Sequence, residues 1–368
     1  MRKLAIIGAS FGQIKICEEA NKMGLYTVGF AWAEGAICKD LFSKFYPVSI
    51  MEKDKIVDIC REEKIDGVVS NGSDVTSNVC AYISDKLGLI GNNYQDFNNA
   101  QNKFYVRNAT NNIPELSPIK ACLLNKNDKS IDFPLPCVVK PCVGWSKKGV
   151  CFIHSKSDVE NSLEYAREIN DEIMFEEFVL GREISVETLS YQQNHFIVQI
   201  TDKDVSGAPH FVELGHHEPA SINNDVKNKI YRVVPKILDA IRYHNGATHI
   251  EMKIDKNNNI YLVEINLRGG GDDISNKLVP LSTGFNYTKA MIEIALGDFH
   301  MPKEIKNKHY AGIYYLCQQT GDKLKYFTNP TKDVIECEIK SYDLSESKTN
   351  YDRNGYLIYC GNKKLILE

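Results

Sequence analysis

Three oxygen-bearing side chains lie in two apolar segments of the stretch THIEMKIDKNNNIYLVEINLRGGG. Glu251 lies in the first segment, and Glu264 and Asn266 close the second. The polar run between them predicts a turn, so residues 248–254 and 260–265 are expected to pair as strands. Period-2 geometry puts Glu264 and Asn266 on one face, and a hairpin brings Glu251 opposite them. Three oxygen ligands on a rigid sheet suit a hard cation such as Mg²⁺.

Arg268 and the glycines Gly269, Gly270 and Gly271 follow this hairpin directly. An arginine can neutralise developing charge on a phosphate, and glycines let backbone N–H groups approach an anion. On this stretch alone, an exposed edge hairpin with a glycine-rich turn is an equal alternative.

A second group of residues suits a polyphosphate. The strand predicted at 137–140 ends in Lys140 and leads into CVGWSKKGV, a loop that carries Ser146, two lysines and Gly149. Backbone amides and ammonium groups of such a loop can face a polyphosphate. It is not a Walker A motif, because the lysine precedes the loop and no GK[ST] begins a helix. The alternative is an ordinary charged hairpin turn.

Lys103 and Arg107 lie four residues apart in the polar segment 96–112, which is predicted to be one helix. The local pattern favours an exposed, solvated face for both side chains.

The stretch IMFEEFVLGRE can hold a purine nucleotide. Glu177 and Val179 offer backbone groups for the Watson–Crick edge of the base, and Glu183 offers a carboxylate for ribose hydroxyls. The glutamates of this region, Glu176 and Glu187 included, are equally consistent with the exposed side of two strands.

The segment FVELGHHEPASI (211–222) is expected to be an irregular loop that contacts a substrate. It carries Glu213 and two adjacent histidines, His216 and His217. Neighbouring side chains usually point apart, so the two histidines are not expected to share a metal ion.

Elements that position these residues follow in order. Residues 1–95 are predicted to form a parallel, helix-covered sheet, because strand and helix patterns alternate along them. The strands are expected at 4–7, 26–30 and 67–70, and the helices at 14–23, 53–64 and 75–87. GASFG lacks the full GxGxxG fingerprint, which argues against a dinucleotide-dependent oxidoreductase. Helices are also expected at 157–169, with Ser157 as N-cap, and at 224–244, interrupted by Pro235. Residues 301–368 resemble a small antiparallel β cap.

Composition bounds the class of protein. The chain has 368 residues, 43% of them hydrophobic, with a formal net charge of −4 and no long basic run, which argues against a nucleic-acid binder. Eleven cysteines without a CxxC pair are expected to be reduced core thiols. The apolar run near the N-terminus is too short for a signal peptide, and no segment has the length of a membrane span. We therefore expect a cytoplasmic protein without membrane or nucleic-acid partners.

The order of these motifs along the chain resembles the ATP-grasp superfamily, and most closely its carboxylate–amine ligases of the L-amino-acid ligase type. The resemblance implies an α/β fold, α+β in its central and C-terminal parts, with an ATP-grasp fold behind an N-terminal Rossmann-like pre-ATP-grasp domain. The implied domains are 1–95, a small subdomain with the phosphate loop at 96–180, a large subdomain with the metal and substrate site at 181–300, and the cap at 301–368.

The resemblance also implies residue roles. The residues that would bind ATP are Lys103, Lys140, the loop from Ser146 to Gly149, Glu176, Glu177, Val179 and Glu183. One or two Mg²⁺ ions, or Mn²⁺, would be held by Glu251, Glu264 and Asn266. The substrates would be bound by Glu213, His216, His217, Gly269 and Gly270, with Arg268 as the catalytic residue. Two positions depart from the family pattern. His249 stands where many members have an arginine, and Trp145 makes the phosphate loop bulkier than usual.

The implied reaction begins with attack of a small carboxylate, expected to be that of an amino acid, on the γ-phosphorus of ATP, which gives an acyl phosphate and ADP. An amine then displaces phosphate to leave an amide. Two alternatives remain open: a bicarbonate-activating or phosphotransferase enzyme, and a nucleotide-binding protein without turnover. A homodimer is implied only by analogy with other members.

Overall fold

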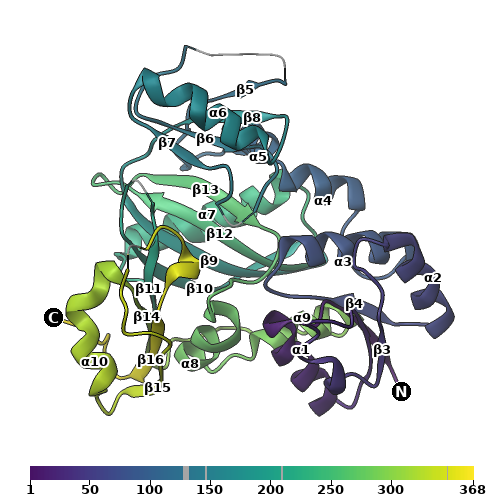
Figure 1. The fold of residues 1–368 in the computed structure, drawn as a ribbon. Coiled ribbons are helices and arrows are strands. Elements are labelled where there is room, and N and C mark those ends of the chain that lie inside the picture. The colour runs from purple at the N-terminus through teal and green to yellow at the C-terminus, as the bar shows by residue number, and fades with distance from the viewer. Residues whose placement is uncertain (127–131, 146, 209, 346) are drawn as a thin grey trace.

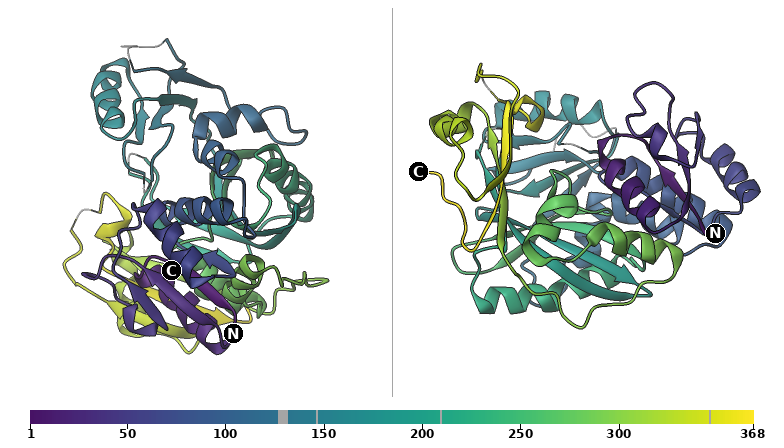
Figure 2. Two further views of the ribbon diagram at one scale, coloured as in Figure 1. Left: turned by 90° about the vertical axis from the view of Figure 1, so that its right-hand side faces the viewer. Right: turned by 90° about the horizontal axis from the view of Figure 1, so that it is seen from below.

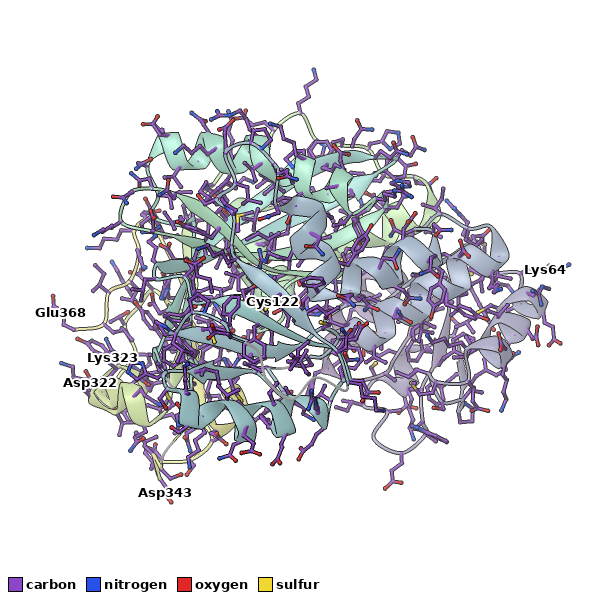
Figure 3. All side chains as sticks on the ribbon, turned by 90° about the horizontal axis from the view of Figure 1, so that it is seen from above. Lys64, Cys122, Asp322, Lys323, Asp343 and Glu368 are labelled. Atoms are coloured by element: carbon purple, nitrogen blue, oxygen red, sulfur yellow. The ribbon has the colours of Figure 1, made fainter. Side chains whose placement is uncertain are left out.

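The computed structural model describes residues 1–126, 132–145, 147–208, 210–345 and 347–368 (Figure 1). Its strands form three sheets: two of four strands and one of eight. The small sheet that carries β5–β8 projects from the rest of the molecule, as the left view of Figure 2 shows. In Figure 3, Lys64 of the N-terminal part lies at one end of the molecule, and Asp322, Lys323 and Asp343 lie at the other.

The N-terminal sheet is parallel, with the strand order β3-β2-β1-β4. Its strands are β1 (Lys3–Ile7), β2 (Tyr26–Phe30), β3 (Lys44–Tyr46) and β4 (Gly67–Val69). One face packs against α1 (Phe11–Lys22) and against α9 (Tyr287–Leu296), which comes from much later in the chain. The other face packs against α2 (Lys53–Glu63) and α3 (Asp74–Leu87). The predicted parallel, helix-covered sheet is confirmed.

The polar segment after this sheet forms two helices, α4 (Tyr94–Gln101) and α5 (Lys103–Thr110). The expectation of one helix over 96–112 was wrong, because Asn102 between them has an extended backbone. The Asn102 side chain accepts hydrogen bonds from the backbone N–H groups of Phe104 and Tyr105, both at 3.0 Å, and so caps α5. Lys103 is therefore fixed at the first position of a helix.

The second four-stranded sheet is antiparallel, with the order β5-β8-β6-β7. It comprises β5 (Ala121–Leu124), β6 (Cys137–Pro141), β7 (Cys151–Ile153) and β8 (Ile173–Glu177). It packs against α6 (Val159–Arg167). The single helix expected at 157–169 is a short 3-10 turn, η2 (Lys156–Asp158), followed by α6. Ser155 caps that turn, so the expected cap at Ser157 was wrong.

The large sheet is antiparallel, with the order β13-β12-β9-β10-β11-β14-β16-β15. Its strands are β9 (Arg182–Tyr191), β10 (Asn194–Val205), β11 (Glu213–Glu218), β12 (Gly246–Ile254), β13 (Ile260–Asn266), β14 (Tyr310–Leu316), β15 (Val334–Ile339) and β16 (Gly355–Gly361). α7 (Asn224–Ala240) covers part of it and continues through Pro235, so the expected interruption was wrong. Between β13 and α9 lie a π-helical turn, η3 (Ile274–Leu278), and α8 (Val279–Thr283).

Two expectations about this sheet need correction. Residues 213–218 are not an irregular loop but strand β11, because the polar side chains that break the hydrophobic pattern find partners and are buried. The antiparallel strands after residue 301 continue the large sheet through β14, which pairs with β11, and so extend it instead of standing apart as a cap. Short helices in this last part are η4 (Gln318–Lys323), α10 (Leu324–Thr328) and η5 (Asn350–Asp352), and η1 (Lys39–Leu41) lies near the N-terminus.

All eleven cysteines are free thiols, in agreement with the expectation from the sequence. Among the helices that the structure describes, none is both long and apolar enough to cross a membrane.

Candidate active site

The β12–β13 hairpin forms as expected and sets two carboxylates side by side. Glu251 lies directly opposite Glu264, and His249 lies opposite Asn266. The register shifts between Glu251 and Met252, which marks a bulge beside the first carboxylate. Two carboxylates and an amide oxygen on adjacent strands form a donor set that fits a hard cation such as Mg²⁺.

Each of these carboxylates is paired with a lysine from another element. Lys103 Nζ lies 3.0 Å from Glu264 Oε1, and Lys203 Nζ on β10 lies 3.1 Å from Glu251 Oε1. Lys203 also lies 3.2 Å from Glu213 Oε1. Lys103 is further tied to the glycine loop, because its ammonium donates to the carbonyl of Gly144 and its backbone N–H to that of Cys142. Positive and negative groups from five elements (α5, β10, β11, β12 and β13) therefore meet at one place.

Lys140 belongs to a buried ion triad. Its Nζ lies 2.8 Å from Glu176 Oε1, while Arg107 donates two hydrogen bonds to Glu176 Oε2 at 2.9 and 2.6 Å. Burial alone would raise the pKa of Glu176, but Lys140 and Arg107 hold it below its ordinary value. The exposed-face interpretation of Arg107 was wrong, as was that of Glu176: both side chains are almost fully buried. Any contact of Glu176 with a base would have to come from its backbone.

The expected nucleotide segment is held by Lys253, which lies on the same β12 strand as Glu251. Its Nζ lies 3.1 Å from the carbonyl oxygen of Val179 and 3.3 Å from Glu183 Oε1. The same ammonium lies 4.7 Å from the centroid of the Phe178 ring. Glu177 is exposed, and its backbone N–H is bonded to the carbonyl of Lys120. Lys253 thus fixes two of the groups assigned to the nucleotide.

The glycine loop reaches the large sheet through Lys147. Its Nζ donates to the carbonyl of Phe211 at 2.9 Å and lies 3.3 Å from Glu213 Oε1. Gly149 has a φ of +74° and faces Pro141 and Ile169, so a side chain there would meet both strain and crowding. Ser146, the other predicted residue of this loop, lies outside the described residues.

Glu213, His216 and Asp272 form a compact cluster next to the hairpin. Their ligand atoms lie within 4.8 Å of one another. Arg353 holds Asp272 with two hydrogen bonds of 2.7 and 2.9 Å. Burial would raise the pKa of Asp272, but the hydrogen bonds and charges of His216 and Arg353 lower it to about 2. Lys203 and Lys147 neutralise Glu213. Three cationic side chains therefore neutralise the two carboxylates of this cluster, as Lys103 and Lys203 neutralise those of the hairpin.

The two adjacent histidines lie on opposite faces of β11, as expected. His216 faces Asp272 at 3.4 Å, and its Nδ1 is buried without a partner among the described residues. Burial would lower its pKa, but the Asp272 and Glu213 carboxylates raise it, which favours the imidazolium. His217 instead bonds Asp204 at 3.0 Å and Tyr359 at 3.2 Å. It does not join the cluster assigned to the substrate.

The glycine turn after β13 is anchored by Glu187. One oxygen of this carboxylate accepts from the backbone N–H of Gly270 at 2.8 Å, and the other bonds His249. Burial would lower the pKa of His249, but Glu187 and Glu251 raise it to about 9. His249 therefore carries a positive charge next to Glu251, as the arginine typical of the family would.

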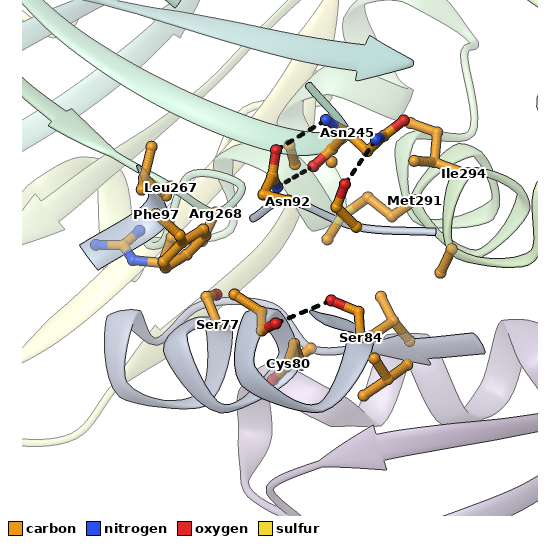
Figure 4. A pocket seen from close by; sticks show the side chains of 18 of the residues that line it. Ser77, Cys80, Ser84, Asn92, Phe97, Asn245, Leu267, Arg268, Met291 and Ile294 are labelled. Carbon is orange, nitrogen blue, oxygen red and sulfur yellow. Dashed lines mark hydrogen bonds between the residues drawn. The ribbon is translucent and has the colours of Figure 1, made fainter. Parts of the chain in front are cut away.

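Arg268 connects the hairpin to the N-terminal sheet. Its Nε lies 3.1 Å from Asp74 Oδ1 at the start of α3. Figure 4 shows Arg268 beside Phe97 and Leu267 at a cavity of about 80 Å³ between α3 and the large sheet. Gly269 packs against Asn71, where an added Cβ would lie 2.8 Å from the amide oxygen. The turn therefore lies between the N-terminal sheet and the large sheet.

Sequence reasoning missed four residues of this site: Lys203, Lys253, Asp272 and Arg353. The exposed-face interpretation of Glu187 was wrong, because its side chain is fully buried. The only local signal was the alternation of β9, β10 and β12, which points Glu187, Lys203 and Lys253 toward one face. Arg353 gave no signal, because it lies 81 residues after its partner Asp272.

Comparison with known proteins agrees with this architecture. The family model of the ATP-grasp domain matches residues 133–277. A D-alanine–D-alanine ligase of Ruthia magnifica subsp. Calyptogena magnifica is 26% identical over 185 residues, which cover 49% of this chain and 62% of that protein. An alanine–anticapsin ligase of Bacillus subtilis is 25% identical over 59% of this chain and 51% of that protein.

Among solved structures, the L-amino acid ligase from Bacillus licheniformis superimposes with a TM-score of 0.81 at 23% identity. That match covers 99% of this chain and 94% of the other. The chain spans about half the length of the curated relatives it matches.

The domain match and the fold define the class: residues 133–277 are an ATP-grasp domain, and the chain shares its fold with the L-amino acid ligase. The curated relatives named above are ligases.

Proposed function

We propose that this protein is an ATP-dependent carbon–nitrogen ligase. It activates a small carboxylate, that of an amino acid, as an acyl phosphate and joins it to an amine, with release of ADP and phosphate. The observation that carries the proposal is the meeting of Glu251 and Glu264, opposed on the hairpin, with Lys103 and Lys203 from α5 and β10. This combination suits phosphoryl transfer, which needs positioning and charge neutralisation more than covalent help.

ATP would lie between the small sheet and the hairpin, with Mg²⁺, or Mn²⁺, held by Glu251, Glu264 and Asn266. The ion supplies neutralisation of the polyphosphate charge when bound. Lys103 and Lys203 now neutralise the two carboxylates, so both ammonium groups become available to phosphate oxygens once a cation takes their place. Lys253 orients Glu183 toward the ribose and holds the Val179 carbonyl.

The reacting carboxylate would lie near Arg268 and the N–H groups of the Gly269–Gly270 turn. Glu187 orients that turn through its bond to the Gly270 N–H. Lys147 reaches across to Phe211 and Glu213 and holds the glycine loop over the site. A closed loop keeps water from an acyl phosphate, which would otherwise hydrolyse.

The amine would approach the cluster of Glu213, His216 and Asp272, whose carboxylate oxygens can accept hydrogen bonds from it. The cations around the cluster favour the neutral form of the amine, which is the nucleophile. Glu213 and Asp272 raise the pKa of His216, which favours its imidazolium form. His216 therefore fits stabilisation of the oxyanion of the tetrahedral intermediate better than removal of the amine proton. Glu213, whose pKa is held well below the ordinary value, is a weak base as well. The amine proton accordingly leaves to solvent or to the departing phosphate.

Replacement of Glu264 tests the proposal. Glu264→Ala removes one proposed metal ligand from a partly exposed position, so we expect loss of Mg²⁺-dependent ADP release without loss of fold. Glu115→Ala is the matched control, because Glu115 is also a partly exposed carboxylate but pairs only with Arg232 on the surface. Full activity in Glu264→Ala, with unchanged Mg²⁺ dependence, contradicts the metal assignment.

A further inference from the structure

The C-terminal part of the chain builds a pocket that adjoins the Glu213–His216–Asp272 cluster. It has a volume of about 200 Å³ and is lined by Tyr315, Lys340, Asn350, Tyr351, Arg353 and Tyr356, together with a glycine. All of these residues lie outside the stretch matched by the ATP-grasp family model. The pocket is therefore a feature of this chain that the domain match does not describe.

Three of the lining residues touch the cluster directly. Both terminal nitrogens of Arg353 donate hydrogen bonds to the Asp272 carboxylate. Asn350 accepts a hydrogen bond from the backbone N–H of Glu213 at 2.9 Å. Tyr315 packs edge-on against the His216 ring, with centroids 6.0 Å apart. The Arg353 guanidinium lies over the Tyr315 ring, 3.6 Å from its centroid. A molecule held at the cluster thus has this pocket as its neighbour.

The walls of the pocket are cationic. Its lining holds one arginine and one lysine and no carboxylate. Asp272 neutralises Arg353, but Lys340 forms no ion pair with any carboxylate that the structure describes, and its side chain is exposed at the pocket. The hydroxyl of the exposed Tyr351 adds a hydrogen-bond donor. The hydroxyls of Tyr315 and Tyr356 donate to Asp272 and Glu336 instead. The Lys340 ammonium, the Asn350 amide N–H groups and the Tyr351 hydroxyl therefore form a site for a small anion.

We infer that this pocket binds the anionic side chain of an acidic amino acid whose α-amino group lies at the Glu213–His216–Asp272 cluster. Lys340 is the specificity-determining residue, and Arg353 is a positioning residue that keeps Asp272 in place. The inference rests on the proposed function, because it assigns the pocket to the amine substrate. It deepens that function by naming the class of amine: L-glutamate or L-aspartate in preference to the neutral amides of the same shape.

The test compares the binding of L-glutamate and L-glutamine by isothermal titration calorimetry. The full chain is used with Mg²⁺ and a non-hydrolysable ATP analogue, so no turnover is needed. One charge-assisted hydrogen bond predicts about tenfold tighter binding of L-glutamate. Lys340→Gln should weaken L-glutamate by about the same factor and leave the two ligands equal. Lys332→Gln, at an exposed lysine outside the pocket, is the matched control and should keep the preference.

Equal affinities in the wild type, no binding of either ligand, or a preference that Lys340→Gln leaves intact would each overturn the inference. Glu264→Ala separates it from the proposed function. That variant should lose ADP release and still prefer L-glutamate. A wild type that prefers L-glutamate yet never turns over ATP with any amine would leave the pocket in place and refute the ligase. ATP turnover with neutral amines only, without a binding preference for L-glutamate, would support the ligase and refute the assignment of the pocket.

Discussion

Removal of Arg107 tests how the small sheet is joined to the hairpin. Arg107 on α5 donates two hydrogen bonds to Glu176 on β8 and a third to the carbonyl of Leu262 on β13 at 2.6 Å. Arg107→Met keeps the length of the side chain but leaves a buried carboxylate with one cation and a buried carbonyl without this donor. Loss of two hydrogen bonds to a charged group and of the donor to a buried carbonyl costs about 3–5 kcal/mol in sum. We expect a loss of that size in the free energy of unfolding.

The assay is urea unfolding followed by far-UV circular dichroism. Arg61→Met is the control, since Arg61 pairs with Asp58 on the surface and such pairs contribute about 0.5 kcal/mol or less. The double variant Arg107→Met/Glu176→Gln should lose more stability than Arg107→Met alone, because buried Lys140 is then left without a carboxylate. If Arg107→Met is as stable as Arg61→Met, the triad does not hold these elements together and the argument is refuted.

Two further predictions concern buried groups. Burial raises the pKa of Glu218 to about 8, so between its unfolded pKa and pH 8 only the folded chain binds this proton. The free energy of unfolding should fall as pH rises through that window, by at most about 5 kcal/mol. In thermal unfolding scans from pH 5 to 8.5, Glu218→Gln should flatten this fall. A pH profile that the substitution leaves unchanged would show that Glu218 is ionised in the folded protein. Lys253→Met should raise KM for ATP about tenfold and leave kcat within about twofold, because it frees Glu183 and the Val179 carbonyl without touching the reacting groups; an unchanged KM in steady-state assays would exclude this role.

The local sequence pattern predicted those parts of the fold whose contacts lie between residues close together in the chain. The hairpin of Glu251 and Glu264 was predictable because strand alternation and a polar turn lie within twenty residues, and the register follows from them. The parallel N-terminal sheet was predictable for a similar reason, since β1, β3 and β4 are each followed by a helix.

Burial of charge was not predictable, because it depends on partners far along the chain. Arg107 has the sequence surroundings of an exposed helix, and only the fold brings Glu176 to it from 69 residues away. Residues 213–218 look like a loop because they are polar, yet Lys203, Asp204 and Ser282 supply the partners that let β11 be buried. Asp272 and Arg353 meet only because β14 and β16 extend the large sheet. The substrate side of the site was therefore the part that sequence described least well.

The most direct test of the account is ADP release with Mg²⁺-ATP across amino acids and small carboxylic acids, offered singly and in pairs, with the amide product measured by mass spectrometry. The account predicts release that requires one carboxylate and one amine together, with one amide formed for each ADP. Release that is independent of any amine, or that yields no amide with any pair while ATP is still consumed, would contradict it.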